Sequence, residues 1–406
     1  MLNVLAGAGC AAIAPKNTET VKVGILHSLS GTMALSERAV MQATVLGLTE
    51  INEAGGVLGR PIEPVIVDGR SDWPTFKRQA KRLILDEGVV TVFGCWTSAS
   101  RRTVRPVFEH YNHLLIYPVQ YEGLEQSPNI VYTGASPNQQ IIPAVAWSMQ
   151  HVGRRFFIVG SDYVFPRTAG AIIHDHISAL GGALVGEEYI LLGSKDVEGV
   201  VERIVAAKPD IILNTINGDS NVAFFRALRE RGIWPRDIPT MSFSIAEPEL
   251  QSLHVSHLAG DYATWSYFQS LDTAENQHFV SAFRDKNGAH QALGDPMEAA
   301  YFGTKLWAQA VNQVGRADVG AIRNAMGRQS YLAPEGVVYV DPDTQHTWKN
   351  VRVGRIRDDG QFDVVWDSTK PVRPDPFPLT RRREQWMAFL DDMYQDWGGR
   401  WARPAM

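Results

Sequence analysis

The sequence is poor in cysteine and carries no excess of positive charge. Its 406 residues contain two cysteines, Cys10 and Cys95, and the formal net charge is −5 at pH 7. Cys95 lies inside an apolar, strand-like run, where a buried free thiol is expected. Cys10 lies in an N-terminal stretch with no recognisable partner element, so no structural disulfide is predicted. The net charge, and the lack of a basic stripe with interleaved aromatic residues, argue against nucleic acid as a partner.

Motifs that would indicate catalysis or a cofactor are also missing. The chain contains no GxSxG nucleophile elbow and no phosphate-binding P-loop. The letters GAGCAA at residues 7–12 resemble a dinucleotide fingerprint, but no strand precedes them and no βαβ unit surrounds them. His174 and His176 stand two apart on an expected helix and therefore face different directions, unlike a pair of metal ligands. The sequence predicts neither an enzyme nor a metal or cofactor site.

The first 20 residues differ in character from the rest of the chain. The stretch MLNVLAGAGCAAIA is apolar and rich in small residues, like the end of a secretory signal or a lipoprotein signal around a cysteine. No Lys or Arg precedes it, however, and Gly7 stands where a lipoprotein signal usually has Leu. A periplasmic or membrane-anchored extracytoplasmic location is the favoured interpretation, and a cytoplasmic one is the alternative. No later stretch approaches the roughly 20 apolar residues of a membrane span.

From residue 21 onward, strand-like apolar runs alternate with amphipathic helical segments. VKVGIL and IEPVIVD predict the first two strands, with a helix over residues 36–54 between them that ends at Gly55-Gly56. TVFGC and LLIYP predict two more strands, and a second run of the same kind begins at FFIVG, after the loop at residues 134–140. This alternation predicts parallel sheets covered by helices on both faces. The chain is long enough for two such α/β lobes.

Polar clusters directly follow five of the apolar runs. They are WTSAS (96–100), VQYEG (119–123), SDYVF (161–165), INGDS (216–220) and SIAE (244–247). In open α/β sheets, ligands bind outside the carboxyl ends of the strands. Because the five clusters come from both halves of the chain, they predict a binding cleft between two sheets.

Ten residues in or beside these clusters are the candidate ligand contacts. They offer hydroxyl, amide, indole and carboxylate groups: Trp96, Thr97, Ser98, Tyr117, Gln120, Tyr121, Tyr163, Asp219, Ser244 and Glu247. Structural alternatives remain open, namely helix N-capping for the Thr, Ser and Asp residues and core packing for the tyrosines. Arginine occurs only at the edges of the clusters, as Arg101 and Arg167, so a strongly anionic ligand is not expected. A small neutral molecule with N–H donors and one carbonyl fits the available groups.

Several longer motifs resemble one known family. VGILHSLSGTMA, INEAGGVLGRPIEPVIVD, FGCWTSASRR, YPVQYEGLEQSPNIVYTG, GSDYVFPR, NTINGDSNVAFF, DPMEAAY and PVRPDPF together resemble the type I periplasmic binding proteins. Within that family they are most similar to the urea and short-chain amide receptors of ABC transporters, and the resemblance extends from Val21 to Phe377. It implies two Rossmann-like α/β lobes with parallel sheets, joined by three hinge crossovers that let the lobes close on a ligand.

The resemblance also implies a division of the chain and roles for single residues. Lobe 1 is expected to comprise residues 21–137 and 264–340, and lobe 2 residues 138–263 and 341–377. In a cytoplasmic branch of the family that senses aliphatic amides, the segments matching CWTSAS, YPVQYEG and GSDY contact the amide. This implies Trp96, Ser98, Tyr117 and Tyr163 in this chain. A further hydroxyl of that branch falls at Ser244 or Ile245.

Two functional hypotheses follow. The leading one is a solute-binding receptor that captures urea or a short-chain amide and delivers it to the permease subunits of an ABC transporter, without a cofactor. The alternative is a cytoplasmic amide-sensing regulator that controls an amidase or nitrile-converting operon through a partner protein. A homodimer is left open in either case.

The C-terminal tail, residues 378–406, matches neither the urea receptors nor the amide sensor. Its sequence predicts a helix with Trp386, Leu390, Met393 and Trp397 on one stripe. That stripe is expected to pack on its own lobe, with a partner surface as the alternative.

Overall fold

The computed structural model describes residues 19–404, so Cys10 and most of the signal-like segment lie outside the described residues. The chain begins with a five-stranded sheet of order β2-β1-β3-β4-β5, whose strand pairs are all parallel. The strands are β1 (Val21–His27), β2 (Ile62–Asp68), β3 (Val92–Gly94), β4 (Leu115–Tyr117) and β5 (Ile130–Tyr132). The helices that connect the first four are α1 (Ala34–Glu53), α2 (Trp73–Leu85) and α3 (Ser98–His110). The predicted alternation of strands and helices is confirmed here.

A seven-stranded sheet of order β15-β14-β10-β9-β8-β6-β7 forms the second half. Its parallel strands are β6 (Arg155–Ser161), β7 (Ala183–Ile190), β8 (Ile211–Thr215), β9 (Thr240–Ser242) and β10 (Tyr262–Trp265). Its helices are α4 (Ile141–His151), α5 (Val164–Ala179), α6 (Glu198–Ala207), α7 (Ser220–Glu230) and the short α8 (Glu247–Leu250).

The second sheet is parallel from β10 to β7, as expected, and carries two further strands at one edge that make it mixed. β14 (Arg352–Ile356) pairs antiparallel with β10, and β15 (Phe362–Asp367) pairs antiparallel with β14. The two strands form a hairpin joined by the short stretch at residues 357–361, and strands joined by so short a connection run antiparallel to each other.

A small antiparallel sheet and three helices complete the first half. They are α9 (Ala274–Asn287), α10 (Asp295–Val314), α11 (Val319–Met326), β11 (Ser330–Ala333), β12 (Gly336–Val340) and β13 (Thr347–Trp348). Residues of α10, α11 and β12 share one buried apolar cluster with residues of β1, including Val23, Val311, Ile322 and Val338. The chain thus returns to the first sheet after β10, as the sequence predicted.

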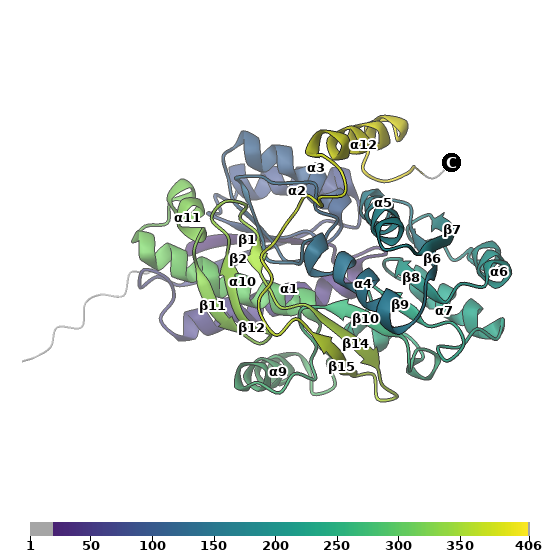
Figure 1. Cartoon of the computed structure of the whole chain (residues 1–406). Coiled ribbons are helices and arrows are strands. Elements are labelled where there is room, and N and C mark those ends of the chain that lie inside the picture. The colour runs from purple at the N-terminus through teal and green to yellow at the C-terminus, as the bar shows by residue number, and fades with distance from the viewer. Residues whose placement is uncertain (1–18, 405–406) are drawn as a thin grey trace, which may run out of the picture.

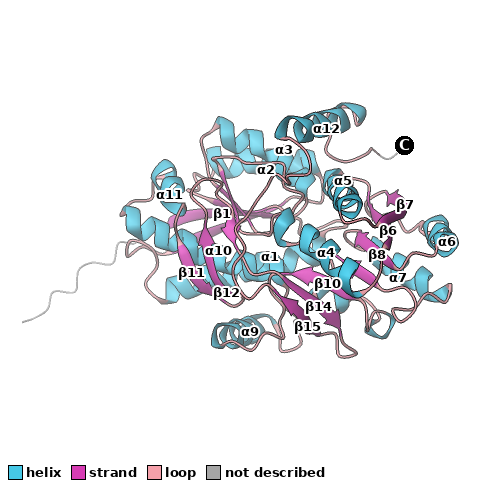
Figure 2. Cartoon of the chain, in the orientation of Figure 1, coloured by secondary structure: helices cyan, strands magenta, loops and turns pink. Residues whose placement is uncertain are grey.

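The chain passes three times between the two sheets, after β5, after β10 and after β13. Figure 1 shows the resulting two lobes side by side, with β1, α10 and α11 in one and β6, β8 and α7 in the other. Helices flank the strands in both lobes (Figure 2). The expected boundary at residues 340/341 falls inside the β12–β13 pairing, so β13 goes with lobe 1.

Local sequence explains why individual elements begin and end where they do. The Asp72 carboxylate accepts a hydrogen bond from the Thr75 backbone N–H at 2.9 Å, and Pro74 occupies the first turn of α2. Phe76, Ala80 and Leu83 then recur at helical spacing and are fully buried. The start and the inward face of α2 were both predicted from this pattern.

The C-terminal tail packs on its own chain. Its helix α12 (Arg383–Asp396) buries Trp386, Leu390 and Met393 in the same apolar cluster as residues of α4 and α5. Figure 1 shows α12 as the yellow helix beside α3 and α5. Packing on its own chain, the first of the two expectations, is confirmed.

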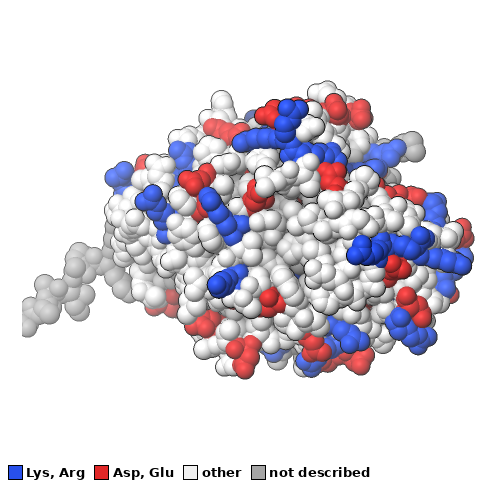
Figure 3. Space-filling view, viewed as in Figure 1, with Lys and Arg blue, Asp and Glu red and all other residues white. Residues whose placement is uncertain are grey.

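Charge and hydropathy agree with the sequence analysis. On the face drawn in Figure 3, cationic and anionic side chains are interspersed around the periphery and few lie in the middle. Over residues 19–404, no helix is both long and apolar enough to cross a membrane. Cys95 is a buried free thiol, as expected.

Candidate functional site

The loop after β3 leads straight into α3 and holds three of the predicted residues. Thr97 is the N-cap of α3, and its hydroxyl accepts a hydrogen bond from the Ser100 backbone N–H at 3.1 Å. This is the structural alternative that the sequence left open for Thr97. Ser98, the first residue of the helix, is buried and directs its hydroxyl to the loop that follows β4.

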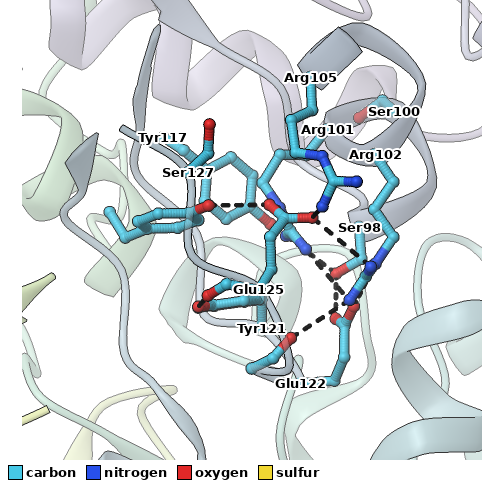
Figure 4. A network of polar contacts seen from close by, with 12 residues as sticks. Ser98, Ser100, Arg101, Arg102, Arg105, Tyr117, Tyr121, Glu122, Glu125 and Ser127 are labelled. Atoms are coloured by element: carbon cyan, nitrogen blue, oxygen red, sulfur yellow. Dashed lines mark hydrogen bonds and ion pairs between the residues drawn. The ribbon is translucent and has the colours of Figure 1, made fainter. Parts of the chain in front are cut away.

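Ser98 belongs to a buried network of charged side chains, drawn in Figure 4, that we call the arginine–glutamate cluster: Arg101, Arg102, Glu122 and Glu125. The Ser98 hydroxyl donates to the Glu122 carboxylate and accepts from the Arg101 guanidinium at 3.1 Å. Arg102 Nε donates to Glu122 Oε1 at 2.9 Å. The Ser98 hydroxyl is therefore held in place by two charged neighbours.

Glu125 is the second carboxylate of the arginine–glutamate cluster. It accepts hydrogen bonds from Arg101 Nε at 2.8 Å, from the Tyr132 hydroxyl at 2.9 Å and from Arg105 at 3.2 Å. Burial alone would raise its pKa, but the arginines outweigh burial and hold the pKa at about 2. The Glu125 carboxylate consequently stays ionised at neutral pH.

Trp96, Tyr117 and Tyr163 lie around this cluster. The Tyr117 hydroxyl donates to the Trp96 carbonyl at 2.6 Å, and the Tyr117 ring packs under the Arg101 guanidinium. Tyr163 comes from lobe 2, just before α5. Burial raises the pKa of its hydroxyl, and the electrostatic effect of Tyr117 and Glu122, both of lobe 1, raises that pKa further. Over residues 19–404, the Tyr163 hydroxyl and the Trp96 indole N–H make no hydrogen bond. Both donors are therefore without a hydrogen-bond partner in the described part of the chain.

Gln120 and Ser244 meet where the two lobes touch. Gln120 Nε2 of lobe 1 donates to the Phe243 carbonyl of lobe 2 at 2.9 Å, next to Ser244. Gln120 Oε1 and Ser244 Oγ are buried without a hydrogen-bond partner among the described residues. Buried polar atoms without a partner are uncommon in native proteins and call for an explanation.

Glu247 begins α8, close to Ser244 in sequence. Its Oε1 accepts the Gln269 backbone N–H at 2.7 Å, and its Oε2 is a further buried atom without a partner in the described chain. Burial raises the pKa of Glu247 to about 8, so the carboxyl is mostly protonated at neutral pH. It adds no net charge to this region.

Asp219 makes a contact between the lobes instead of capping α7. Its side chain forms no capping hydrogen bond, but accepts one from the Thr32 hydroxyl of lobe 1 at 2.7 Å. The Ser36 hydroxyl of lobe 1 likewise donates to the Glu249 carboxylate of lobe 2 at 2.7 Å. These two bonds and the Gln120 bond hold the lobes together in a closed arrangement.

Tyr121 is a predicted site residue whose hydrogen bonds and ring stacking stay within lobe 1. Its hydroxyl bonds to His346 and to the Glu125 carbonyl, and its ring stacks on Tyr132. All these partners belong to lobe 1. The core-packing alternative therefore describes its contacts, and its role toward a ligand stays a prediction.

Sequence reasoning missed Thr32, Ser36 and Glu122. Thr32 and Ser36 follow β1, in the stretch HSLSGTMALS, which has the same make-up as the five clusters that were recognised. A sixth cluster could have been found by that signal. Glu122 lies inside the predicted VQYEG cluster, but nothing in the sequence shows that it pairs with the arginines of α3.

A second group of buried charges joins the three passages between the lobes. This lysine–carboxylate cluster consists of Lys349, Asp295, Glu298 and Glu335, all with fully buried side chains. Lys349 Nζ lies 3.4–4.0 Å from the three carboxylates and donates to the Thr133 carbonyl at 3.2 Å. Asp295 Oδ2 accepts the backbone N–H groups of Ser266 and Tyr267 at 2.9 and 3.0 Å. One cation and one carboxylate thus contact all three passages.

Two α/β lobes, three passages and polar side chains that face each other from both lobes define the two-lobed class of ligand-binding proteins. Comparison with protein-family models agrees: the model described as "Periplasmic binding protein domain" matches residues 21–383. The chain belongs to this family of periplasmic binding proteins. The family is one of solute-binding proteins, which confirms the prediction that the chain is not an enzyme.

Individual relatives cover most of the chain at low identity. A Leu/Ile/Val-binding protein homolog 6 from Brucella melitensis is 23% identical over 353 residues, which are 85% of this chain and 90% of that protein. A solute-binding protein of an ABC transporter from Rhodopseudomonas palustris HaA2, solved in complex with p-hydroxybenzoic acid, superposes with a TM-score of 0.81 at 23% identity. The match covers 90% of this chain and all of that one.

LivJ from Streptococcus pneumoniae, solved with isoleucine, gives a TM-score of 0.75 at 19% identity, and the match covers 88% of this chain and 100% of that chain. These two structures show a shared fold.

A limonene hydroxylase from Geobacillus stearothermophilus is 32% identical over 120 residues, which are 30% of this chain. The chain spans only 22% of that protein's length, so the match says nothing about the activity of this chain.

Proposed function

We propose that the chain is a solute-binding receptor that captures urea or a short-chain amide between its lobes and delivers it to an ABC permease. It would act in the periplasm or anchored at the outer side of the cytoplasmic membrane. Ligand capture would stabilise the closed arrangement of the lobes, and the closed form would dock on the permease.

The observation that carries the proposal is the set of free polar atoms between the lobes. The Tyr163 hydroxyl, the Trp96 N–H and the Ser244 hydroxyl can donate, while Gln120 Oε1 can accept. An amide offers one carbonyl acceptor and N–H donors within a few ångströms. It would therefore supply partners of both kinds to a set that has both kinds unsatisfied.

Charge supports a neutral ligand. Among the described residues, the arginines that adjoin these free atoms, Arg101 and Arg102, are already paired with Glu122 and Glu125. A ligand carboxylate would have to compete with two buried glutamates for those guanidinium groups. This sets the proposal apart from the aromatic acid and the isoleucine found in the solved relatives.

Calorimetric titration of the purified protein with urea, formamide, acetamide, leucine and 4-hydroxybenzoate tests the proposal directly. Binding of urea or one of the amides is the expected result. Exclusive binding of leucine or 4-hydroxybenzoate would refute the proposed ligand class. A preference for acetamide with no binding of urea would favour the amide-sensing regulator.

A matched pair of variants tests the site. Tyr163→Phe removes only the free hydroxyl and is expected to weaken amide binding by about 1 kcal/mol, or roughly fivefold. Tyr339→Phe makes the same chemical change on β12 and is the control. Equal affinities for the two variants would take Tyr163 out of the site.

A further inference from the structure

The C-terminal tail is anchored firmly on lobe 2. Two nitrogens of the Arg381 guanidinium group, Nε and Nη2, donate to the two carboxylate oxygens of Asp175 on α5 at 2.7 and 2.8 Å. Trp386 is fully buried and donates its indole N–H to the Pro378 carbonyl at 2.9 Å. Bidentate pairs of this kind fix orientation as well as position.

Past α12 the chain runs along the start of α5, beside Tyr163. The Val164 backbone N–H donates to the Trp401 carbonyl at 3.0 Å, and the Arg403 backbone N–H donates to the Asp162 carbonyl at 3.1 Å. Tyr163 and Ala402 form an antiparallel bridge. The segment 397–404 therefore holds the backbone on either side of Tyr163.

The same segment also contacts lobe 1. The Trp401 ring lies under the Arg102 guanidinium, 4.9 Å from its central carbon to the ring centroid. Arg102 bonds to Glu122, and Glu122 accepts the Ser98 hydroxyl. One side chain of the tail thus connects the Tyr163 side of the site with the Ser98 side.

The two contacts differ in strength. The contact with lobe 2 consists of backbone hydrogen bonds and a buried helix face. Between lobe 1 and the tail, by contrast, lies a cavity of about 770 Å³, lined by Trp73, Lys77 and Arg102 on one side and by Leu390, Tyr394 and Trp401 on the other. The tail is therefore expected to move with lobe 2 and to detach from lobe 1 when the lobes separate.

We infer that the segment 397–404 is an interlobe clamp, with Trp401 as a positioning residue that stabilises the closed form through Arg102. The clamp holds together the two sides of the ligand site of the proposed function, and to that extent the inference rests on the proposed function. It acts on closure itself whatever the ligand is.

Trp401→Ala in the full chain tests the clamp, and Trp397→Ala is the matched control. Trp397 lies in the same tail but lines a cavity formed with α5 and β7 of lobe 2. The expected result for Trp401→Ala is a roughly tenfold faster dissociation of acetamide or urea, as for the loss of a partly buried cation–π contact. Trp401→Phe keeps an aromatic face for Arg102 and is expected to restore most of the wild-type rate. Rates for Trp401→Ala equal to those of Trp397→Ala would overturn the inference.

A second measurement keeps the clamp distinguishable from the ligand assignment. Small-angle scattering without any ligand is expected to give a larger radius of gyration for Trp401→Ala than for Trp397→Ala, because the closed form loses a contact. If no amide or urea binds the wild type, this difference alone decides the inference. Identical scattering of the two variants would then overturn it, and thermal melting of each variant confirms that both are folded.

Discussion

The two buried charge clusters of this protein both pair basic with acidic side chains, but their carboxyl groups behave in opposite ways. In the arginine–glutamate cluster, two arginines face two glutamates, and the pKa of Glu125 is held at about 2. In the lysine–carboxylate cluster, one lysine faces three carboxylates, and burial raises the pKa of Glu335 to about 7. The pKa of Glu298 is raised as well, by burial and by Glu335.

The difference shows that burial alone does not decide the charge of a carboxyl group. Burial favours the neutral form in both clusters, and the number of cations within reach decides whether that effect is reversed. The arginine–glutamate cluster holds the Ser98 hydroxyl in place. The lysine–carboxylate cluster lies at the passages between the lobes, and its charge depends on pH.

Removal of Lys349, the single cation of the lysine–carboxylate cluster, should have the largest effect on stability. Lys349→Met leaves three buried carboxylates without a positive partner, and we expect the free energy of unfolding to fall by about 5 kcal/mol. Guanidinium chloride denaturation measures this without the complication that urea is a proposed ligand. Lys370→Met, at an exposed lysine, is the control. A loss no greater than that of the control would show that the carboxyls are already neutral and do not need Lys349.

Removal of Arg101, one of the two arginines of the arginine–glutamate cluster, should lower the free energy of unfolding by less. Arg101→Met takes away the hydrogen bonds to Ser98 and Glu125 but leaves Arg102 and Arg105 nearby. We expect a loss of about 3 kcal/mol in the same denaturation experiment. Arg226→Met on the surface of α7 is the control. A loss larger than that of Lys349→Met would reverse the order of the two clusters.

The pH dependence of stability should differ between the clusters. The folded-state pKa of Glu335 lies above its ordinary value of 4.5, so its contribution to stability is complete below about pH 4.5 and is lost as the pH rises through about 7. Glu125, whose pKa is lowered to about 2, contributes above pH 4.5 and loses that contribution as the pH falls through about 2. Burial raises the pKa of Glu335 most, Lys349 and Arg352 oppose that rise, and Asp295 adds to it.

Glu335→Gln tests this smallest effect. Relative to wild type, the variant should lose less stability between pH 4.5 and 7, because the amide cannot ionise. Guanidinium chloride midpoints at half-unit pH steps measure the slope. Glu230→Gln, on the solvent side of α7, should keep the wild-type slope. Parallel curves for both variants would mean that Glu335 does not titrate in this range.

Much of the fold could be predicted because it depends on local patterns. The strand IEPVIVD has the bounds that the sequence predicted, and α1 begins and ends within two residues of the predicted helix, since alternation, caps and glycines act within a few residues. The sequence did not predict that an antiparallel hairpin, β14–β15, extends the second sheet. Strand direction depends on where the third passage enters the sheet, which no local pattern shows.

The site was predicted as a set of segments but not as a set of contacts. The clusters after β3, β4 and β9 do meet, because the strands that position them end at the facing edges of two sheets. Thr97 and Asp219 carried the same alternative of helix capping, and only the structure separates them: Thr97 caps α3, whereas Asp219 bonds to Thr32 of the other lobe.

The sequence by itself determined the two-lobed α/β architecture and the membership in a binding-protein family, and it predicted polar segments of which several meet in the structure. These depend on periodicity, turn residues and motifs, all of which are local. Only the tertiary structure decided which charges pair and what the tail does. Glu122 meets Arg102, Lys349 meets Glu335 and Trp401 meets Arg102 across separations of 14 to about 300 residues. Such pairings arise from the packing of whole elements, which burial stabilises and sequence spacing does not encode.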